Sequence, residues 1–149
     1  MKQIVRILAL VAAVGMLFAS SSFSQGRHWR GSGGWGYRAS FDRMYDPQTV
    51  ETVNGEVVGV SEAPPLKGMS NGVHLKLKTD KETLSVHLGP SWYIMNQDTR
   101  IDLKDKIEVT GSRVTFDGMP AIIAAEVKKG DEILRLRDDG YPRWSGWRR

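Results

Sequence analysis

The fold of this chain is decided by the stretch VHLKLKTDKETLSVHL, residues 73–88. Apolar and polar residues alternate on both sides of a turn at residues 80–81, which is the pattern of two half-buried strands. Pairing residues whose numbers sum to 161 aligns the apolar side chains of both strands and places His74 opposite His87. The sequence therefore predicts a β-hairpin with one apolar face and one polar face, and with the two histidines side by side.

Further strands and one helix are expected around this hairpin. The strands are predicted at residues 49–60, 106–116, 119–127 and 132–137, and the helix at residues 91–97. The valines of the first strand fall on both of its faces, and a bend or bulge near Gly59 would explain this change of face. In the helix, Trp92, Met95 and Tyr93 are expected to face inward. A helix between strands three and four is the order of the OB-fold, so we predict an all-β chain that forms a small five- to six-stranded OB-like barrel.

Two stretches on either side of the hairpin carry a resemblance to a known family. VNGEV at residues 53–57 and DKIEVTG at residues 105–111 resemble the small exported bacterial OB-fold (BOF) proteins and related exported OB-like domains. The similarity covers about residues 49–128. It implies a periplasmic, non-enzymatic, stress-associated binding role. The long Gly/Arg/Trp-rich ends and the extra strand depart from the family pattern, so the identity of a ligand does not transfer.

The first 24 residues have the layout of a secretory signal peptide. Lys2 and Arg6 precede a short apolar run at residues 7–19, and small residues follow it. The run is shorter than the roughly 20 residues of a membrane-spanning helix. We expect cleavage after Ser24 or nearer Ala19, with an uncleaved anchor as the alternative. The predicted location is periplasmic or secreted, with no transmembrane span in the mature chain.

Composition divides the rest of the chain into three parts. Residues 25–48, rich in Gly, Arg and aromatic residues, predict a disordered linker. Residues 49–137 predict the barrel, and residues 138–149 a basic aromatic tail. Segment 49–134 holds 10 basic and 13 acidic residues, so the net charge of +4 comes from the ends. The absence of cysteine excludes disulfides and thiolate metal sites, so a hydrophobic core must hold the domain.

Two motifs match enzyme signatures but lack the structural context that those signatures need. GMSNG at residues 68–72 fits G-x-S-x-G, yet a nucleophile elbow follows a strand and precedes a helix. GSGGWG at residues 31–36 fits G-x-G-x-x-G, but no strand precedes it and no helix follows. We interpret both as flexible loops. Because no base and nucleophile can be paired on this framework, we predict that the protein is not an enzyme and has no cofactor.

The two histidines of the hairpin are candidate metal ligands. Opposed cross-strand residues have Cβ atoms about 4.5–5.5 Å apart, and imidazole suits Zn, Cu or Ni. Their neighbours Lys76 and Ser85 are poor ligands, whereas His28 offers a third. Alternatively, His74 and His87 pack on each other as strand residues, in which case mutual repulsion lowers the pKa values of both.

The polar face of the hairpin is also a candidate binding face. OB-fold proteins bind ligands on strands two and three, which here carry His74, Lys76, Lys78 and His87. Trp92 either lines a ligand groove beside this face or packs into the core. Two exposed lysines and two imidazoles indicate an anionic ligand.

Arginine and aromatic residues recur at both ends of the chain, and in the tail we assign Arg143, Trp144 and Trp147 to binding. This mixture suits single-stranded nucleic acid, an anionic membrane surface, or tail aromatics folded back on the acidic barrel. Export disfavours genomic nucleic acid. We therefore predict a binding module for an anionic partner or an envelope surface. The alternatives are periplasmic Zn or Cu binding through the histidine pair and a structural envelope protein.

Overall fold

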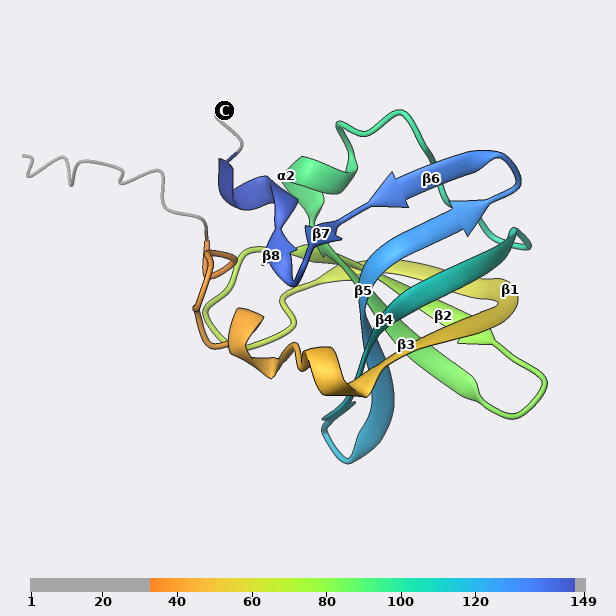
Figure 1. Cartoon of the computed structure of the whole chain (residues 1–149), viewed down its shortest axis with the longest axis horizontal. Helices are drawn as coiled ribbons and strands as arrows, with labels where there is room; N and C mark the ends of the chain where they lie inside the picture. The colour runs from red at the N-terminus through yellow and green to blue at the C-terminus, as the bar shows by residue number, and fades with distance from the viewer. Residues whose placement is uncertain (1–32, 147–149) are drawn as a thin grey trace, which may run out of the picture. The chain divides into compact units, whose positions relative to one another are not determined.

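The computed structural model describes residues 33–146 (Figure 1). The long strands are β1 (Val50–Ala63), β2 (Gly72–Lys78), β3 (Thr83–Pro90), β4 (Lys106–Phe116) and β5 (Met119–Lys129). The short strands are β6 (Glu132–Arg135), β7 (Arg137–Asp138) and β8 (Tyr141–Pro142). The helical turns are η1 (Asp42–Met44), η2 (Pro47–Thr49), α2 (Ser91–Ile94) and η3 (Arg143–Gly146). No helix in this part of the chain is long and apolar enough to span a membrane.

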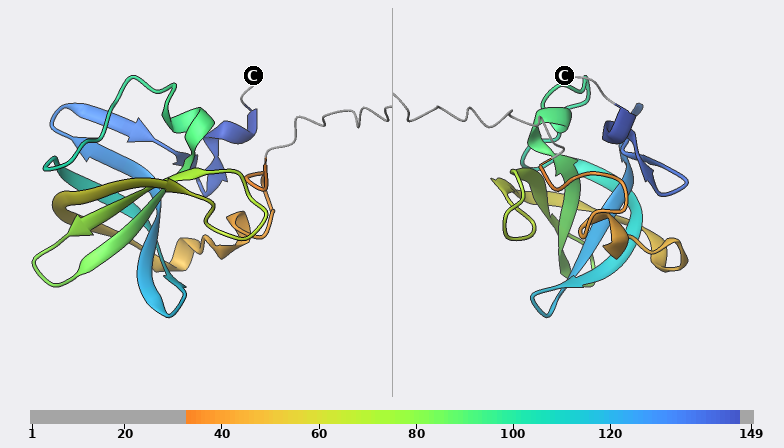
Figure 2. Two further views of the ribbon diagram at one scale, coloured as in Figure 1. Left: turned by 180° about the vertical axis from the view of Figure 1, so that it is seen from behind. Right: turned by 90° about the vertical axis from the view of Figure 1, so that its left-hand side faces the viewer.

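The five long strands close into a barrel, which Figure 2 shows from two further sides. The sheet order is β3-β2-β1-β4-β5-β6, and β3 also pairs in parallel with β5, which closes the ring. The strand β6 extends the sheet beyond the ring, and α2 lies between β3 and β4. The predicted OB-like architecture is therefore confirmed.

The predicted hairpin register is confirmed at every pair from His74 opposite His87 to Lys78 opposite Thr83. The bend in the first strand is also present, because the pairing of β1 with β2 shifts register between Val57 and Gly59. The first half of β1 pairs with β4, and the second half of β1 pairs with β2. This bend lets one strand belong to both sides of the barrel.

Alternate side chains of the long strands fill the barrel interior. The fully buried ones include Val57, Leu75, Leu77, Leu84, Val86, Leu88, Val109 and Ile122. Burying each such side chain stabilises the fold by about 1.5–3 kcal/mol before the loss of chain entropy is counted. The alternation that predicted the strands is thus also what holds them together.

The helix differs from its prediction. It is a single turn, so only one of the three side chains expected to face inward is buried. Tyr93 is 6% exposed and Trp92 is half-buried against the core, whereas Met95 is 65% exposed.

The prediction of a disordered linker is wrong for residues 33–48, because this segment is ordered and contributes to the core. Trp35 and Phe41 are 1% and 2% exposed. The Trp35 indole Nε1 donates a hydrogen bond to the Ser70 carbonyl at 3.2 Å, and the Ser70 amide donates to the Gly33 carbonyl at 2.9 Å. Residues 33–36 therefore pack on the loop at residues 68–72, where a Cβ atom at Gly72 would lie 2.4 Å from the Trp35 ring.

The start of the predicted tail is also ordered. Trp144 is 3% exposed, and its Nε1 donates a hydrogen bond to the Trp35 carbonyl at 2.8 Å. The fully buried side chain of Arg137 pairs with Asp42 at 2.6 Å and lies over the rings of Tyr45 and Trp144. We call residues 33–49 together with residues 135–146 the clasp. They cover one side of the barrel (Figure 1), and burial of the aromatic rings replaces the disorder that composition predicted.

Candidate functional site

A small hollow lies on the outer face of strands β1, β2 and β3, where the sequence placed the binding face. Its volume is about 230 Å³. It is lined by Ser61, Ala63, His74, Leu75, Lys76 and Ser85. Its lining thus includes two serines, one histidine and one lysine.

Strand register brings these polar groups together. Ser61 of β1 lies opposite His74 of β2, and Lys76 of β2 lies opposite Ser85 of β3. On its other side Lys76 lies opposite Gly59, where an added Cβ atom would lie 3.2 Å from the Lys76 Cβ and Cγ atoms. Because glycine has no side chain, there is room for the apolar stem of Lys76 across β1, beside the hollow.

Three exposed lysines lie on this hairpin, with Glu56 opposite Lys78 and Asp80 next to Lys81 as the nearest acidic residues along the strands and turn. Lys76, Lys78 and Lys81 are exposed, and none of them forms an ion pair with any residue between 33 and 146. Unpaired ammonium groups on one hairpin raise the local concentration of anions. We call Lys76 and Lys78, which project from the same face of β2, the lysine row.

The histidines contact each other, but only one of them reaches the hollow. Their ring centroids are 4.4 Å apart at an interplanar angle of 77°, and His74 Nε2 hydrogen-bonds the Ala63 carbonyl at 2.7 Å. His87, predicted on the exposed face, is 5% exposed. Phe116 stacks on it with centroids 4.3 Å apart, and Phe41 of the clasp lies 5.9 Å away. His87 is therefore buried and not exposed as predicted, in part because the clasp, which the sequence did not predict, brings Phe41 against it.

Burial is the larger cause of the altered titration of His87. Desolvation, and then the charge of His74, lowers the pKa of His87 to about 3. The expected repulsion between the two rings therefore contributes, but as the second cause. At neutral pH the His87 imidazole is uncharged and adds nothing to an anion site.

The remaining predicted residues do not join the hollow. Trp144 is buried in the clasp, so its predicted surface role is wrong. Arg143 is exposed and lies 3.5 Å from Asp138, while Trp92 packs against the core. Trp147 and His28 lie outside the described residues. Of the eight residues predicted for binding, His74 and Lys76 line the hollow, and Lys78 follows on the same strand face.

Sequence reasoning missed Ser61, which lines the hollow from β1. Its position depends on how the bulge at residues 57–59 shifts the register. The sequence indicated a bulge but not its effect on pairing, so no signal in the sequence pointed to this hydroxyl.

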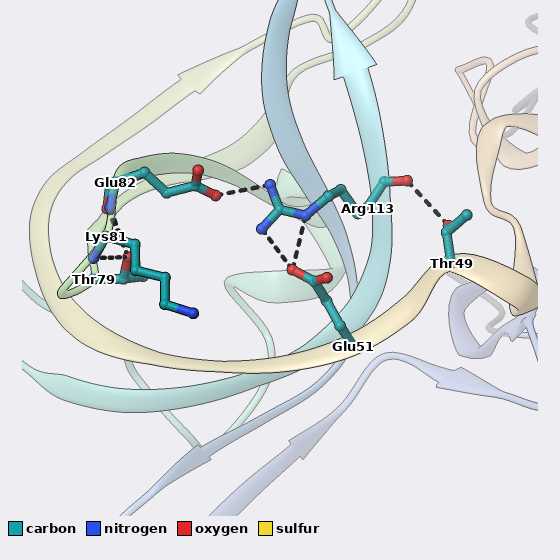
Figure 3. A network of polar contacts seen from close by, with 6 residues as sticks. All are labelled: Thr49, Glu51, Thr79, Lys81, Glu82 and Arg113. Carbon is teal, nitrogen blue, oxygen red and sulfur yellow. Dashed lines mark hydrogen bonds and ion pairs between the residues drawn. The ribbon is translucent and has the colours of Figure 1, made fainter.

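A second missed feature is an ion-pair network beneath the turn of the hairpin (Figure 3). Arg113 donates through Nε and Nη2 to Glu51 Oε1 at 2.8 and 2.6 Å, and its Nη1 lies 2.7 Å from Glu82 Oε1. These hydrogen bonds raise the pKa of Arg113. The network borders a groove of about 1000 Å³ and links the turn between β2 and β3 to β1 through Arg113 of β4.

Within residues 33–146, no group of three or more His, Cys, Asp or Glu side chains is arranged to hold a metal ion. Metal binding by His74 and His87 would have to use two protein ligands, or a ligand from beyond these residues. It stays a prediction.

Comparison with known proteins places this fold in a family. Residues 49–134, which span 86 of the 149 residues, match the model of the MamS/MamX magnetosome protein family. The match gives no support for the BOF family in particular, although the small β-barrel which that resemblance implied is present. A comparison with curated proteins finds no match. The chain belongs to the MamS/MamX magnetosome protein family.

Proposed function

We propose that this chain is a non-enzymatic binding module, associated with magnetosomes like the family it belongs to, that holds an anionic partner on the outer face of β1, β2 and β3. The observation that carries the proposal is the lysine row, which has no ion pair among the described residues and begins at the hollow. In a barrel whose segment 49–134 has a net charge of −3, these two exposed ammonium groups are available to an anionic partner.

The chemistry of the hollow suits an oxyanion group such as a phosphate or a carboxylate. The Lys76 ammonium and the Ser61 and Ser85 hydroxyls are donors that match the acceptor oxygens of such a group. A volume of about 230 Å³ is below the roughly 300–1,000 Å³ of pockets that enclose a whole small molecule. The hollow therefore fits one group of a larger partner that lies along the strand face.

Salt-dependent binding to inorganic polyphosphate and to poly-L-glutamate tests this proposal. We expect the full chain to bind at low salt, and the double variant Lys76→Gln, Lys78→Gln to bind about tenfold more weakly, which corresponds to one charge-assisted hydrogen bond. The matched control, Lys104→Gln with Lys128→Gln, removes the same charge from exposed positions outside the hairpin. Equal losses in both variants, or no binding by the wild type, would overturn the proposal.

Export remains part of the proposal. A signal peptide at residues 1–24 would deliver the protein to the periplasm or the exterior. N-terminal sequencing of the protein from its native cells tests this: a chain beginning at Gln25 supports it, and a chain that retains residues 1–24 in a cytoplasmic fraction contradicts it.

Two observations favour a second candidate function, transition-metal binding by the histidine pair. The Ala63 carbonyl engages His74 Nε2, much as a backbone carbonyl often engages the free ring nitrogen of a metal-ligating histidine, and the buried Nδ1 of His87 has no hydrogen-bond partner among residues 33–146. Calorimetric titration with Zn²⁺ and Cu²⁺ decides the matter. Equal uptake by wild type and a His74→Gln, His87→Gln variant would reject it.

A further inference from the structure

The clasp presents two exposed tyrosines that touch each other. The rings of Tyr37 and Tyr141 have centroids 4.8 Å apart at 46°, and their residues are 50% and 46% exposed. The Arg38 guanidinium lies 5.3 Å from the centre of the Tyr37 ring, and Arg143 is exposed two residues after Tyr141. We call these four residues the Tyr–Arg platform.

A buried ion pair joins the two segments that carry the platform. The Arg38 amide donates a hydrogen bond to Asp42 Oδ2 at 2.7 Å, and Asp42 Oδ1 accepts one from Arg137 at 2.6 Å. Arg137 also donates to the Gly140 carbonyl at 3.0 Å, at the turn between β7 and β8 that carries Tyr141. Two tyrosines more than 100 residues apart in sequence are therefore held in place from beneath.

The backbone at the platform is strained. Arg38 has a φ of 63°, in the left-handed region that a non-glycine residue occupies at a cost of order 1–3 kcal/mol. The hydrogen bond from its own amide to Asp42 maintains this conformation. The strained residue lies at the surface beside Tyr37 and does not contribute to the core. Strain kept at an exposed position points to a role in recognition.

The sequence around the platform has an unusual composition. Residues 25–41 and 140–149 together hold six arginines and no aspartate, glutamate or lysine. Trp29 and Trp147 occur in the same two stretches. Arginine mixed with tyrosine and tryptophan is the composition of protein surfaces that meet a membrane interface, where amphipathic rings sit among headgroups and basic side chains pair with anionic lipids.

We propose that the Tyr–Arg platform docks on an anionic lipid surface. The guanidinium groups of Arg38 and Arg143, the second of which lies 3.5 Å from Asp138, complement lipid phosphates, and exposed phenol rings suit the polar–apolar boundary. A nucleic acid fits less well, because Tyr37 and Tyr141 already contact each other, and their facing sides are not free to take a base between them. The platform lies outside the family-matched residues 49–134 and shares no residue with the lysine row, so it is a second, separate surface.

Co-sedimentation of the full chain with vesicles tests the proposal. The experiment compares two kinds of vesicle: pure phosphatidylcholine, and phosphatidylcholine with phosphatidylglycerol at about 7:3. The difference in binding between them measures the part that depends on lipid charge. The variants are Tyr37→Ser with Tyr141→Ser, and Arg38→Asn with Arg143→Gln, because asparagine tolerates a positive φ. Leu103→Ser, which also removes an exposed apolar side chain, is the matched control.

We expect both platform variants to lose about tenfold of the phosphatidylglycerol-dependent binding, and Leu103→Ser to lose none. The lysine-row variant Lys76→Gln, Lys78→Gln should bind vesicles like the wild type, so the two proposals can fail separately. Circular dichroism and thermal unfolding of each variant check that it folds. Unchanged vesicle binding by folded platform variants would overturn the proposal. A single-stranded oligo(dT) is tested in parallel, and variants that lose binding to oligo(dT) while they keep binding to vesicles would also overturn it.

Discussion

At the residue scale, the histidine pair shows what alternation in a sequence predicts and what it does not. The register that places His74 opposite His87 follows from local patterning, because each side chain of a strand alternates between faces. The burial of His87 depends instead on two residues distant in sequence: Phe116, at the end of β4, and Phe41, which comes from a segment without periodicity. The contact was therefore predictable, and the environment was not.

Burial of His87 makes the stability of the fold sensitive to acid. The unfolded chain takes up a proton near the ordinary pKa of 6.5, whereas the folded chain resists until about pH 3. This contribution to stability is complete above pH 6.5 and is lost as pH falls toward 3, at about 1.4 kcal/mol per pH unit. Urea unfolding at pH 7, 5.5 and 4.5 measures it.

His87→Phe is the informative variant for this measurement, since a phenyl ring can stack on Phe116 but cannot titrate. We expect its free energy of unfolding to fall less steeply with acid than that of the wild type. Parallel pH profiles for the two proteins would show that His87 does not carry the effect.

At the scale of elements, glycines decide where strands and loops approach each other. Gly59 was predicted as the site of a bend and lies at the bulge of β1. Gly72 was not singled out, yet a Cβ atom there would lie 2.4 Å from the ring of Trp35. The difference is physical: a bend is a local property of one strand, whereas the contact with Trp35 arises only when the clasp folds.

Replacing these two glycines by alanine separates the two roles. Gly72→Ala should destabilise the fold by about 1–3 kcal/mol, because the bulky Trp35 ring has to move out of a packed site. Gly59→Ala meets only the flexible stem of Lys76 at 3.2 Å and should have a smaller effect. Chemical unfolding gives both values, and an equal or reversed order would contradict this packing of the clasp.

At the scale of the whole molecule, the chain is a barrel within the family-matched residues 49–134, with a clasp formed largely by the segments on either side. The barrel was predictable, because each long strand carries its own apolar alternation or glycine bend. The clasp was not, because residues 33–49 and 138–146 have no period and are held by aromatic, hydrogen-bond and ion-pair contacts between residues far apart in the sequence. The hollow was half predictable: β2 supplied its lysine and histidine, while Ser61 depended on a shifted register.

The ion pair between Asp42 and Arg137 should be worth far more to the fold than an exposed one. Both side chains are at most 7% exposed, so Asp42→Asn leaves an uncompensated buried charge and should cost about 3–5 kcal/mol. Glu51→Gln weakens a pair with Arg113 that is 37% exposed, and should cost at most about 1 kcal/mol. Thermal and urea unfolding compare them. Similar losses in the two variants would mean that the clasp does not depend on this pair.

The central claim, that the outer face of β1, β2 and β3 binds oxyanions, is tested most directly by nuclear magnetic resonance. Inorganic polyphosphate is titrated into the ¹⁵N-labelled protein while backbone amide shifts are followed. We expect the largest saturable shifts to fall on Ser61, His74, Lys76 and Ser85, and to shrink in the Lys76→Gln, Lys78→Gln variant. Shifts centred on another surface, or none at these four residues, would contradict the claim.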